Sequence, residues 1–374
     1  MAVIGAGVVG CAVVLALARR GVSVAQFEVE EEPALAASGT NSGILHTGFD
    51  STPGELETEL ILASNALREP VLRALAIPVL RCGAVMRPLD DSQLGAVAAI
   101  AANARRNGVS VLERDDGALE LPGEAVTDPV AYTLALVAEA ARHGAVLHTG
   151  VRVDSIEDDG AGLTIGSASG VTVRCRVAVN CAGLEADSVG RLAGDESFSI
   201  YPRKGEFLVF EPPAGGRLDR ILLPVPTKRT KGVLVFPTID GKIVAGPTAV
   251  DLEDKRDWSV RPAARDEIVS KAAPLYPPIA DAEPVFAYAG LRPAGRGVNY
   301  VIGPARTCPR LVHVAAIRST GLSASLGIGE RVIDIVGSLG VQLGPRAALK
   351  GGPPPHVSGP WWRRTADYRA EVTA

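Results

Sequence analysis

The sequence is poor in the residue types that mark several classes of protein. Aromatic residues make up 4% of its 374 residues, and 38 Lys and Arg stand against 42 Asp and Glu. No Lys- or Arg-rich stretch is interleaved with aromatic residues, so we do not expect a dedicated nucleic-acid-binding protein. The five cysteines are odd in number and scattered, without a CxxC pair or a Cys/His cluster at ligand spacing. A disulfide framework, a structural zinc site, an iron–sulfur site and any other metal site are therefore not expected.

Long hydrophobic runs are absent as well. The most apolar early run, Val8 to Ala18, is about half of the ~20 residues that a membrane-spanning helix needs. It lacks a basic leader and so fits a signal peptide poorly. Hydrophobic residues still make up 47% of the chain, enough to bury one large core or two smaller ones. We expect a cytoplasmic globular protein without a transmembrane span, and contact with a membrane surface stays open.

The N-terminal segment has the pattern of a dinucleotide-binding βαβ unit. A short apolar run leads into Gly5-Ala-Gly7-Val-Val-Gly10, an apolar helix pattern follows, and a second apolar run ends in Glu28. Such glycines allow a tight turn, close approach of the backbone to a pyrophosphate, and close packing of helix on strand. Glu28 stands 23 residues after Gly5, near the spacing of about 20 at which an acid binds a ribose hydroxyl. A nucleotide site is therefore favoured over a glycine-rich turn in an ordinary βα unit.

Two further turns indicate FAD rather than a nicotinamide as the bound cofactor. An apolar strand pattern at Ala178–Asn180 runs into the small residues Cys181, Ala182 and Gly183, where the backbone could approach a cofactor closely. A second strand pattern, Leu311–Ala316, leads through Arg318-Ser-Thr-Gly321 into a helix. The N–H groups of that turn suit a flavin carbonyl or a pyrophosphate.

The order of the elements predicts an α/β (α+β two-domain) architecture. A doubly wound, Rossmann-like FAD-binding domain is expected from residues 1–78, 125–194 and 286–343. A β-rich substrate-binding domain is expected to be inserted as residues 79–124 and 195–285, with the active site between the two domains. Residues 344–374 are rich in Pro, Gly and Arg, and we expect this tail to lie over the surface or to be mobile.

These motifs resemble the D-amino-acid-oxidase superfamily of FAD-dependent oxidoreductases. Within it, the chain is most similar to the glycerol-3-phosphate oxidase/dehydrogenase and L-2-hydroxyglutarate oxidase group. The segment Ser38-Gly-Thr-Asn-Ser-Gly-Ile-Leu-His46-Thr-Gly-Phe-Asp50 carries the resemblance most clearly. Similar segments follow at 201–206, 236–248, 290–293 and 318–322, so the resemblance covers nearly the whole chain to about residue 340.

The resemblance implies a non-covalent FAD. Its expected binding residues are Gly5, Gly7, Gly10, Glu28, Ser38, Asn41, Ser42, Gly43, Val153, Ala182, Gly183, Arg318, Gly321 and Leu322.

Oxidising a secondary alcohol on a flavin needs a base for the hydroxyl proton while the carbon delivers hydride to N5. His46 is the best candidate because an imidazole titrates near neutral pH; the alternative is a packed histidine that hydrogen-bonds a loop carbonyl.

An anionic substrate needs fixed cations, and the resemblance implies that Arg292 and Ser319 bind it, with Lys231 as a third contact. The alternatives are a surface arginine for Arg292 and, for Lys231, a solvated loop shared with Lys228 and Arg229.

We therefore expect oxidation of a small anionic secondary alcohol, with glycerol 3-phosphate to dihydroxyacetone phosphate as the leading reaction. L-2-hydroxyglutarate oxidation is the first alternative, and amino-acid or amine oxidation is a weaker one. A non-catalytic FAD-binding subunit is an alternative from another class. The electron acceptor, whether oxygen, a quinone or a redox partner protein, stays open.

Overall fold

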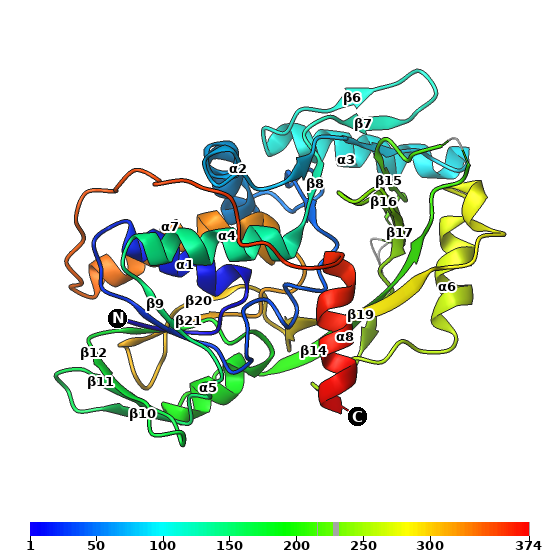
Figure 1. Cartoon of the computed structure of the whole chain (residues 1–374). Coiled ribbons are helices and arrows are strands. Elements are labelled where there is room, and N and C mark those ends of the chain that lie inside the picture. The colour runs from blue at the N-terminus through cyan, green and yellow to red at the C-terminus, as the bar shows by residue number, and fades with distance from the viewer. Residues whose placement is uncertain (215, 227–231, 374) are drawn as a thin grey trace.

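The N-terminal βαβ pattern forms the centre of a six-stranded sheet in the computed structural model, which describes residues 1–214, 216–226 and 232–373 (Figure 1). The strand order is β20-β21-β13-β1-β2-β9, and neighbours pair in parallel except β20 with β21. All three residues of the central strand β1 are buried, as expected for a parallel sheet covered on both faces. The strands are Ala2–Ile4 (β1), Ala25–Phe27 (β2), Val146–His148 (β9), Ala178–Asn180 (β13), Val301–Pro304 (β20) and Leu311–Ala315 (β21).

Long helices pack against this sheet and against one another. Helix α4 starts where the sequence signals it, because the Asp128 side chain accepts hydrogen bonds from the N–H groups of Val130 and Ala131 and Pro129 fills the first helical position. Helix α7 lies against α1 and α2 (Figure 1). The helices are Val8–Ala18 (α1), Leu56–Ala74 (α2), Pro129–Arg142 (α4), Ala186–Leu192 (α5) and Gly321–Ser338 (α7), and the 3-10 turn Gly183–Glu185 (η2) precedes α5.

Two small antiparallel sheets flank the first sheet. One contains Ser155–Asp158 (β10), Leu163–Gly166 (β11) and Thr172–Cys175 (β12). The other contains Ile44–Leu45 (β3), Val79–Leu80 (β4) and Ala125–Thr127 (β8), with β8 in the middle. This second small sheet holds the chain just before His46 against the chain just after Glu124.

A second large sheet has nine strands in the order β18-β14-β17-β16-β15-β5-β7-β6, with β19 also pairing with β14. Strands β14 and β19 pair antiparallel from Ile200↔Gly295 to Val209↔Phe286. This sheet therefore extends beyond the predicted domain boundary at residue 286. Its strands are Ala84–Met86 (β5), Leu112–Glu113 (β6), Leu119–Leu121 (β7), Ile200–Phe210 (β14), Ile221–Leu223 (β15), Leu234–Pro237 (β16), Ile243–Gly246 (β17), Val250–Asp251 (β18) and Phe286–Gly295 (β19).

Short helices accompany this sheet. They are Asp91–Gln93 (η1), Leu94–Arg106 (α3), Ala264–Ala272 (α6) and Pro277–Ile279 (η3).

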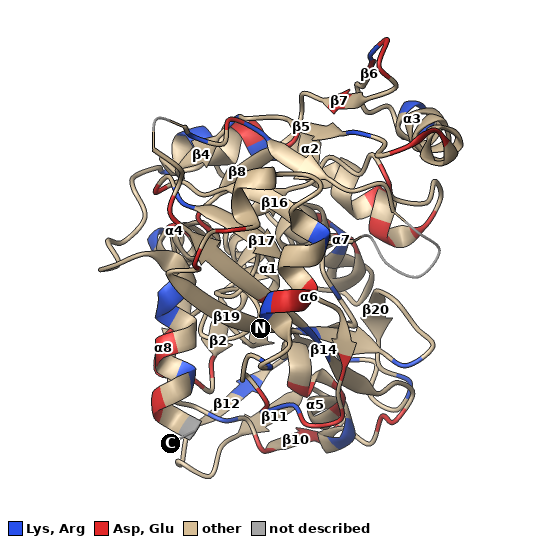
Figure 2. Ribbon diagram, turned by 90° about the vertical axis from the view of Figure 1, so that its right-hand side faces the viewer, with Lys and Arg blue, Asp and Glu red and all other residues tan. Residues whose placement is uncertain are grey.

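The C-terminal tail first runs over the surface and then forms a docked helix, Trp361–Thr373 (α8). Backbone N–H groups of Gly344 and Ala347 donate to carbonyls at the end of α1. Trp361 and Trp362 are buried, and their rings contact Tyr288 and Phe286 of β19. The sequence predicts a tail that lies over the surface or is mobile; in the structure its last segment, α8, is a helix anchored by these two tryptophans. Charged residues alternate along its exposed side (Figure 2).

Within the described residues, no helix is both long enough and apolar enough to cross a membrane. The five cysteines are free thiols, and four of them are buried.

Candidate active site

A cavity of about 1080 Å³ is lined by residues of both large sheets. Its walls include the turns after β1, β13 and β21 in the first sheet and residues of β14, β16 and β19 in the second. Carboxyl ends of parallel strands are where open α/β sheets bind their ligands. The position of the cavity is therefore that of a nucleotide and substrate site.

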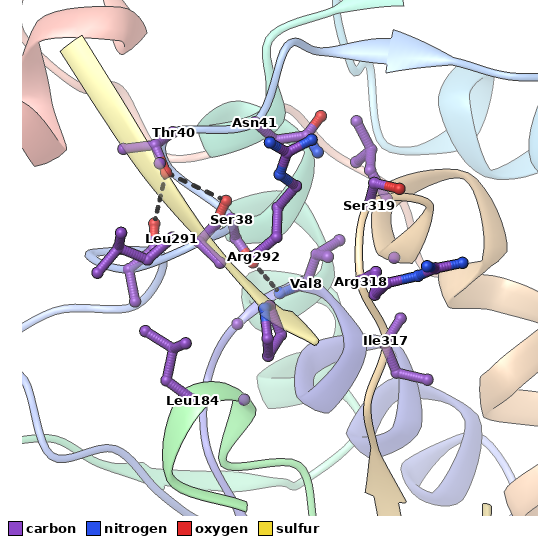
Figure 3. A pocket seen from close by; sticks show the side chains of 18 of the residues that line it. Val8, Ser38, Thr40, Asn41, Leu184, Leu291, Arg292, Ile317, Arg318 and Ser319 are labelled. Carbon is purple, nitrogen blue, oxygen red and sulfur yellow. Dashed lines mark hydrogen bonds between the residues drawn. The ribbon is translucent and has the colours of Figure 1, made fainter. Parts of the chain in front are cut away.

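The glycine-rich turn leaves no room for side chains. A Cβ on Gly5 would lie 2.4 Å from the Cys181 carbonyl oxygen, and one on Gly10 would lie 2.1 Å from the Gly5 carbonyl oxygen. Gly7 lies immediately before α1, whose first turn holds no acidic residue, and the Val8 N–H donates to Ser38 Oγ at 2.9 Å (Figure 3). The positive end of the helix dipole thus faces the cavity, where it suits a pyrophosphate.

Glu28 follows β2 and is held at the cavity wall by backbone N–H groups. Its Oε2 accepts a hydrogen bond from Ala6 N at 2.6 Å and its Oε1 one from Glu30 N at 3.0 Å. Burial raises the pKa of the carboxyl group, although these N–H groups act in the opposite direction. This position, beside the glycine turn, suits an acid that binds a ribose hydroxyl.

Most of the other residues expected at the cofactor line the cavity. Gly43 is the exception, because it lies outside the residues that line the cavity. Gly43 has a φ of +77°, a Cβ there would lie 2.3 Å from the Thr127 carbonyl oxygen, and its own carbonyl accepts the Thr127 N–H. It therefore secures the segment to β8. The expected residues that do line the cavity are Gly5, Gly7, Gly10, Glu28, Ser38, Asn41, Ser42, Val153, Ala182, Gly183, Arg318, Gly321 and Leu322.

His46 lines the same cavity with its side chain 26% exposed. Its backbone is held on both sides: its N–H donates to Ser323 Oγ at 2.8 Å, and its carbonyl accepts from Arg68 at 3.1 Å. The imidazole Nδ1 lies 2.8 Å from Oε2 of Glu124, which is fully buried. The sequence reasoning missed Glu124, because it stands 78 residues from His46 and no local motif marks it.

Arg292 on β19 is a partly buried cation whose hydrogen bonds end on neutral groups. Among the described residues, these bonds go to the backbone carbonyls of Arg203 at 3.0 Å, Lys204 at 3.1 Å and Thr248 at 2.7 Å. Burial, together with the nearby cations Arg203 and Arg318, lowers the pKa of the guanidinium to about 10, while Asp251 acts in the opposite direction. A guanidinium placed in this way provides a positive charge for an anion entering the cavity.

Two further cations surround Arg292. Arg203 stands directly opposite it across the β14–β19 pair, and Arg318 lies on the turn before α7 next to Ser319. Figure 3 shows Arg292 on β19 together with Arg318 and Ser319 on that turn. Like charges directly opposite in a sheet are destabilising, so the pair indicates a function rather than a contribution to stability. Lys231, expected as a third anion contact, lies outside the described residues.

Comparison with known proteins agrees with this geometry. A protein-family model described as FAD dependent oxidoreductase matches residues 1–335. The chain is 29% identical over 359 residues to glycerol 3-phosphate dehydrogenase of Caloramator mitchellensis, covering 92% of this chain and 75% of that protein. It is 27% identical over 277 residues to the mitochondrial L-2-hydroxyglutarate dehydrogenase of Mus musculus, covering 66% of this chain and 60% of that protein.

Solved structures share the fold. The FAD-bound L-alpha-glycerophosphate oxidase of Mycoplasma pneumoniae superimposes with a TM-score of 0.87 at 22% identity, over 95% of this chain and 98% of that one. Glycine oxidase of Geobacillus kaustophilus gives a TM-score of 0.78 at 24% identity, over 90% and 94%. The glycine-rich turn, the N-terminus of α1 and Glu28 fit the dinucleotide part of FAD. The chain belongs to the FAD-dependent oxidoreductase family, and its cofactor is FAD.

Proposed function

We propose that this enzyme oxidises a small anionic secondary alcohol by hydride transfer to flavin N5, with glycerol 3-phosphate as substrate and dihydroxyacetone phosphate as product. The observation that carries the proposal is Arg292, a partly buried guanidinium at the cavity that hydrogen-bonds only neutral carbonyls among the described residues. Removing a cation even partly from water is costly unless an opposite charge compensates it, and a substrate anion would supply that charge.

Each remaining group has a task in this reaction. FAD supplies the hydride acceptor when it is bound. His46 takes the hydroxyl proton as the carbon gives up its hydrogen with the electron pair, so that the C–O bond becomes a carbonyl. Arg292 and Ser319 hold the anionic group, and Lys231 is proposed as a further contact.

Phosphate is favoured over a single carboxylate by the number of cations. Arg203, Arg292 and Arg318 all line the cavity, and the ion pair of Arg203 within the described residues is a long contact, 3.5 Å, to the exposed Asp251. Three guanidinium groups match the higher charge and the larger number of acceptor oxygens of a phosphate. The extent of the similarity to the Caloramator mitchellensis protein supports the same substrate.

L-2-hydroxyglutarate is the second candidate. It is also an anion with a secondary hydroxyl, so the same cations and the same base would serve, and the similarity to the Mus musculus protein supports it. Amine oxidation is less favoured because an amine substrate needs no base for a hydroxyl proton.

Anaerobic flavin bleaching tests the proposal. The FAD-loaded protein is mixed without oxygen with glycerol 3-phosphate, L-2-hydroxyglutarate or a panel of amino acids, and flavin absorbance is followed. Fast bleaching by glycerol 3-phosphate alone is the expected result. Bleaching only by L-2-hydroxyglutarate or only by an amino acid would replace the proposed substrate, and no bleaching by any of them would favour a non-catalytic subunit.

Reoxidation of the bleached protein identifies the acceptor. Adding oxygen or a soluble quinone analogue separately shows which of the two restores the flavin absorbance. Recovery with neither would point to a protein partner.

A further inference from the structure

We propose that Glu124 is the positioning residue of the active site: its carboxylate holds the His46 imidazole with the proton on Nδ1 and leaves Nε2 to accept the substrate proton. This inference rests on the proposed role of His46 as the base. It adds Glu124 as a residue on which the action of His46 as a base depends.

The surroundings of Glu124 make it an acceptor of hydrogen bonds. Its side chain is fully buried, and Oε1 accepts from both the N–H and the hydroxyl of Thr47 at 2.7 Å. A backbone N–H can only donate, so Oε1 is committed as an acceptor. Oε2 faces His46 Nδ1 at 2.8 Å. Both oxygens of the carboxylate thus serve as acceptors, and Nδ1 supplies the proton in its contact with Oε2.

The tautomer of His46 follows from this contact. In a neutral imidazole only one nitrogen carries a proton, and the partner of one nitrogen decides the state of the other. With the proton on Nδ1, Nε2 has a free lone pair. Once Nε2 takes the substrate proton, the imidazole becomes a cation in contact with the Glu124 carboxylate. The same residue thus orients the base and stabilises its charged form.

The fold brings the carboxylate to this point through a close turn. Glu124 follows β7 and precedes β8, and its backbone is held by Leu121 and Gly83. The turn approaches the histidine segment so closely that a Cβ on Gly123 would lie 2.9 Å from Thr47 Cγ2. The approach of Glu124 to His46 therefore depends on a glycine in the turn.

Other ionisable groups near Glu124 do not replace His46 as its partner. Arg68 of α2 is 9% exposed, and it donates to the backbone carbonyls of His46 and Ser323 rather than to the carboxylate. The thiol of Cys82 has its pKa raised to about 11 by burial and, in part, by the charge of Glu124. His46 is the titratable side chain in direct contact with Glu124 within the described chain.

The first test needs no substrate. Nitrogen NMR of ¹⁵N-histidine-labelled protein reports the tautomer of each of the five histidines, and the His46 signal is identified by its loss in His46→Gln. We expect the Nδ1–H tautomer in the unchanged protein and the Nε2–H tautomer in Glu124→Gln, whose amide can donate to Nδ1. An Nε2–H tautomer in the unchanged protein would overturn the proposal.

The second test compares rates of flavin reduction with whichever of glycerol 3-phosphate and L-2-hydroxyglutarate bleaches the flavin. In Glu124→Gln the limiting rate is expected to fall by about 10²–10⁴-fold, the range for losing a positioned base, while the concentration of half-saturation changes little. Glu124→Asp keeps a carboxylate and is expected to recover part of the rate.

Glu139→Gln is the matched control. Glu139 is also fully buried and contacts a histidine, His143, at 3.1 Å, but neither residue lines the cavity. Its replacement is expected to lower stability without changing the rate. A slow His46→Ala variant with an unaffected Glu124→Gln variant would overturn the role of Glu124 alone, whereas an unaffected His46→Ala variant would overturn the proposed base.

Discussion

At the scale of single residues, Arg292 shows how a site can be recognised from an unfavourable local arrangement. A partly buried cation opposite another arginine weakens the sheet that carries it. The carbonyls of Arg203, Lys204 and Thr248 compensate part of this cost and hold the guanidinium in one orientation. A bound anion would compensate the charge of the guanidinium.

Replacing Arg292 by alanine is expected to lower the affinity for substrate more than it lowers the stability of the fold. Loss of a hydrogen bond to a charged group costs about 1.5–3 kcal/mol, so the half-saturating concentration of glycerol 3-phosphate should rise by at least about 10-fold in anaerobic flavin reduction. Arg296→Ala is the control, because Arg296 lies near the same strand but contacts Glu253 and Tyr201 outside the cavity. Equal effects of the two variants would contradict an anion site at Arg292.

Among the elements, the contact of α7 with α2 depends on the absence of a side chain. A Cβ on Gly327 would lie 2.3 Å from the Leu60 carbonyl oxygen, which is backbone and cannot move aside cheaply. We expect Gly327→Ala to lower the free energy of unfolding by about 1–3 kcal/mol, the usual cost of overpacking. Urea unfolding followed by circular dichroism measures it.

Gly95→Ala in α3 provides the opposite case. Nothing lies within 4 Å of a Cβ at Gly95, so alanine should raise stability by about 0.5–1 kcal/mol through its better helix propensity. If Gly327→Ala and Gly95→Ala changed the free energy of unfolding in the same direction, the space around each glycine would not decide whether alanine stabilises or destabilises the protein.

Helix α8 holds the segment 30–35, which follows Glu28, in place. Arg369 donates to Glu30 Oε1 at 2.7 Å and to the Leu35 carbonyl at 2.6 Å, and Thr365 donates to the Ala34 carbonyl at 3.2 Å. This segment leads on to Ser38, which accepts the N–H at the start of α1. Arg369 itself lines the cavity.

Loss of this attachment should weaken FAD binding. We expect Arg369→Ala to raise the dissociation constant of FAD by at least about 10-fold, because hydrogen bonds of a charged group are lost, and a chain ending at Pro360 to raise it further. Flavin fluorescence during titration of the apoprotein measures it. Arg363→Ala is the control on the same helix, since Arg363 pairs with Asp367 of α8 and lies over the Phe286 ring of β19, not against the residues after Glu28. An unchanged dissociation constant for Arg369→Ala would mean that α8 is only a structural support.

For the whole molecule, the cavity is lined by residues of both large sheets and so couples them when a ligand fills it. Because residues of both sheets line it, bound FAD should stabilise both together. At a free FAD concentration 100 times the dissociation constant, the gain is about 2.7 kcal/mol. We expect a single thermal transition that moves upward with FAD and is unaffected by NAD. Two transitions, of which FAD moves only one, would show that the sheets unfold independently.

The sequence by itself determined the features that rest on neighbouring residues. The glycine turn with Glu28 is predicted from a local pattern and lies at the cavity, where its role in binding the cofactor stays a prediction. The start of α4 at Asp128 and Pro129 and the membership of the FAD-dependent family also follow from local motifs, and both are confirmed. Backbone conformation, helix capping and helix dipoles act over a few residues, so their signals stand together in the chain.

Only the tertiary structure decided which distant side chains meet. Glu124 reaches His46 across 78 residues, Arg203 faces Arg292 through strand register, and α8 docks through two tryptophans whose partners lie on β19. Trp361 and Trp362 are visible in the sequence of α8, but nothing near them in the chain shows which surface they pack against. Contacts of this kind depend on the packing of the complete core, and no short stretch of sequence carries that information.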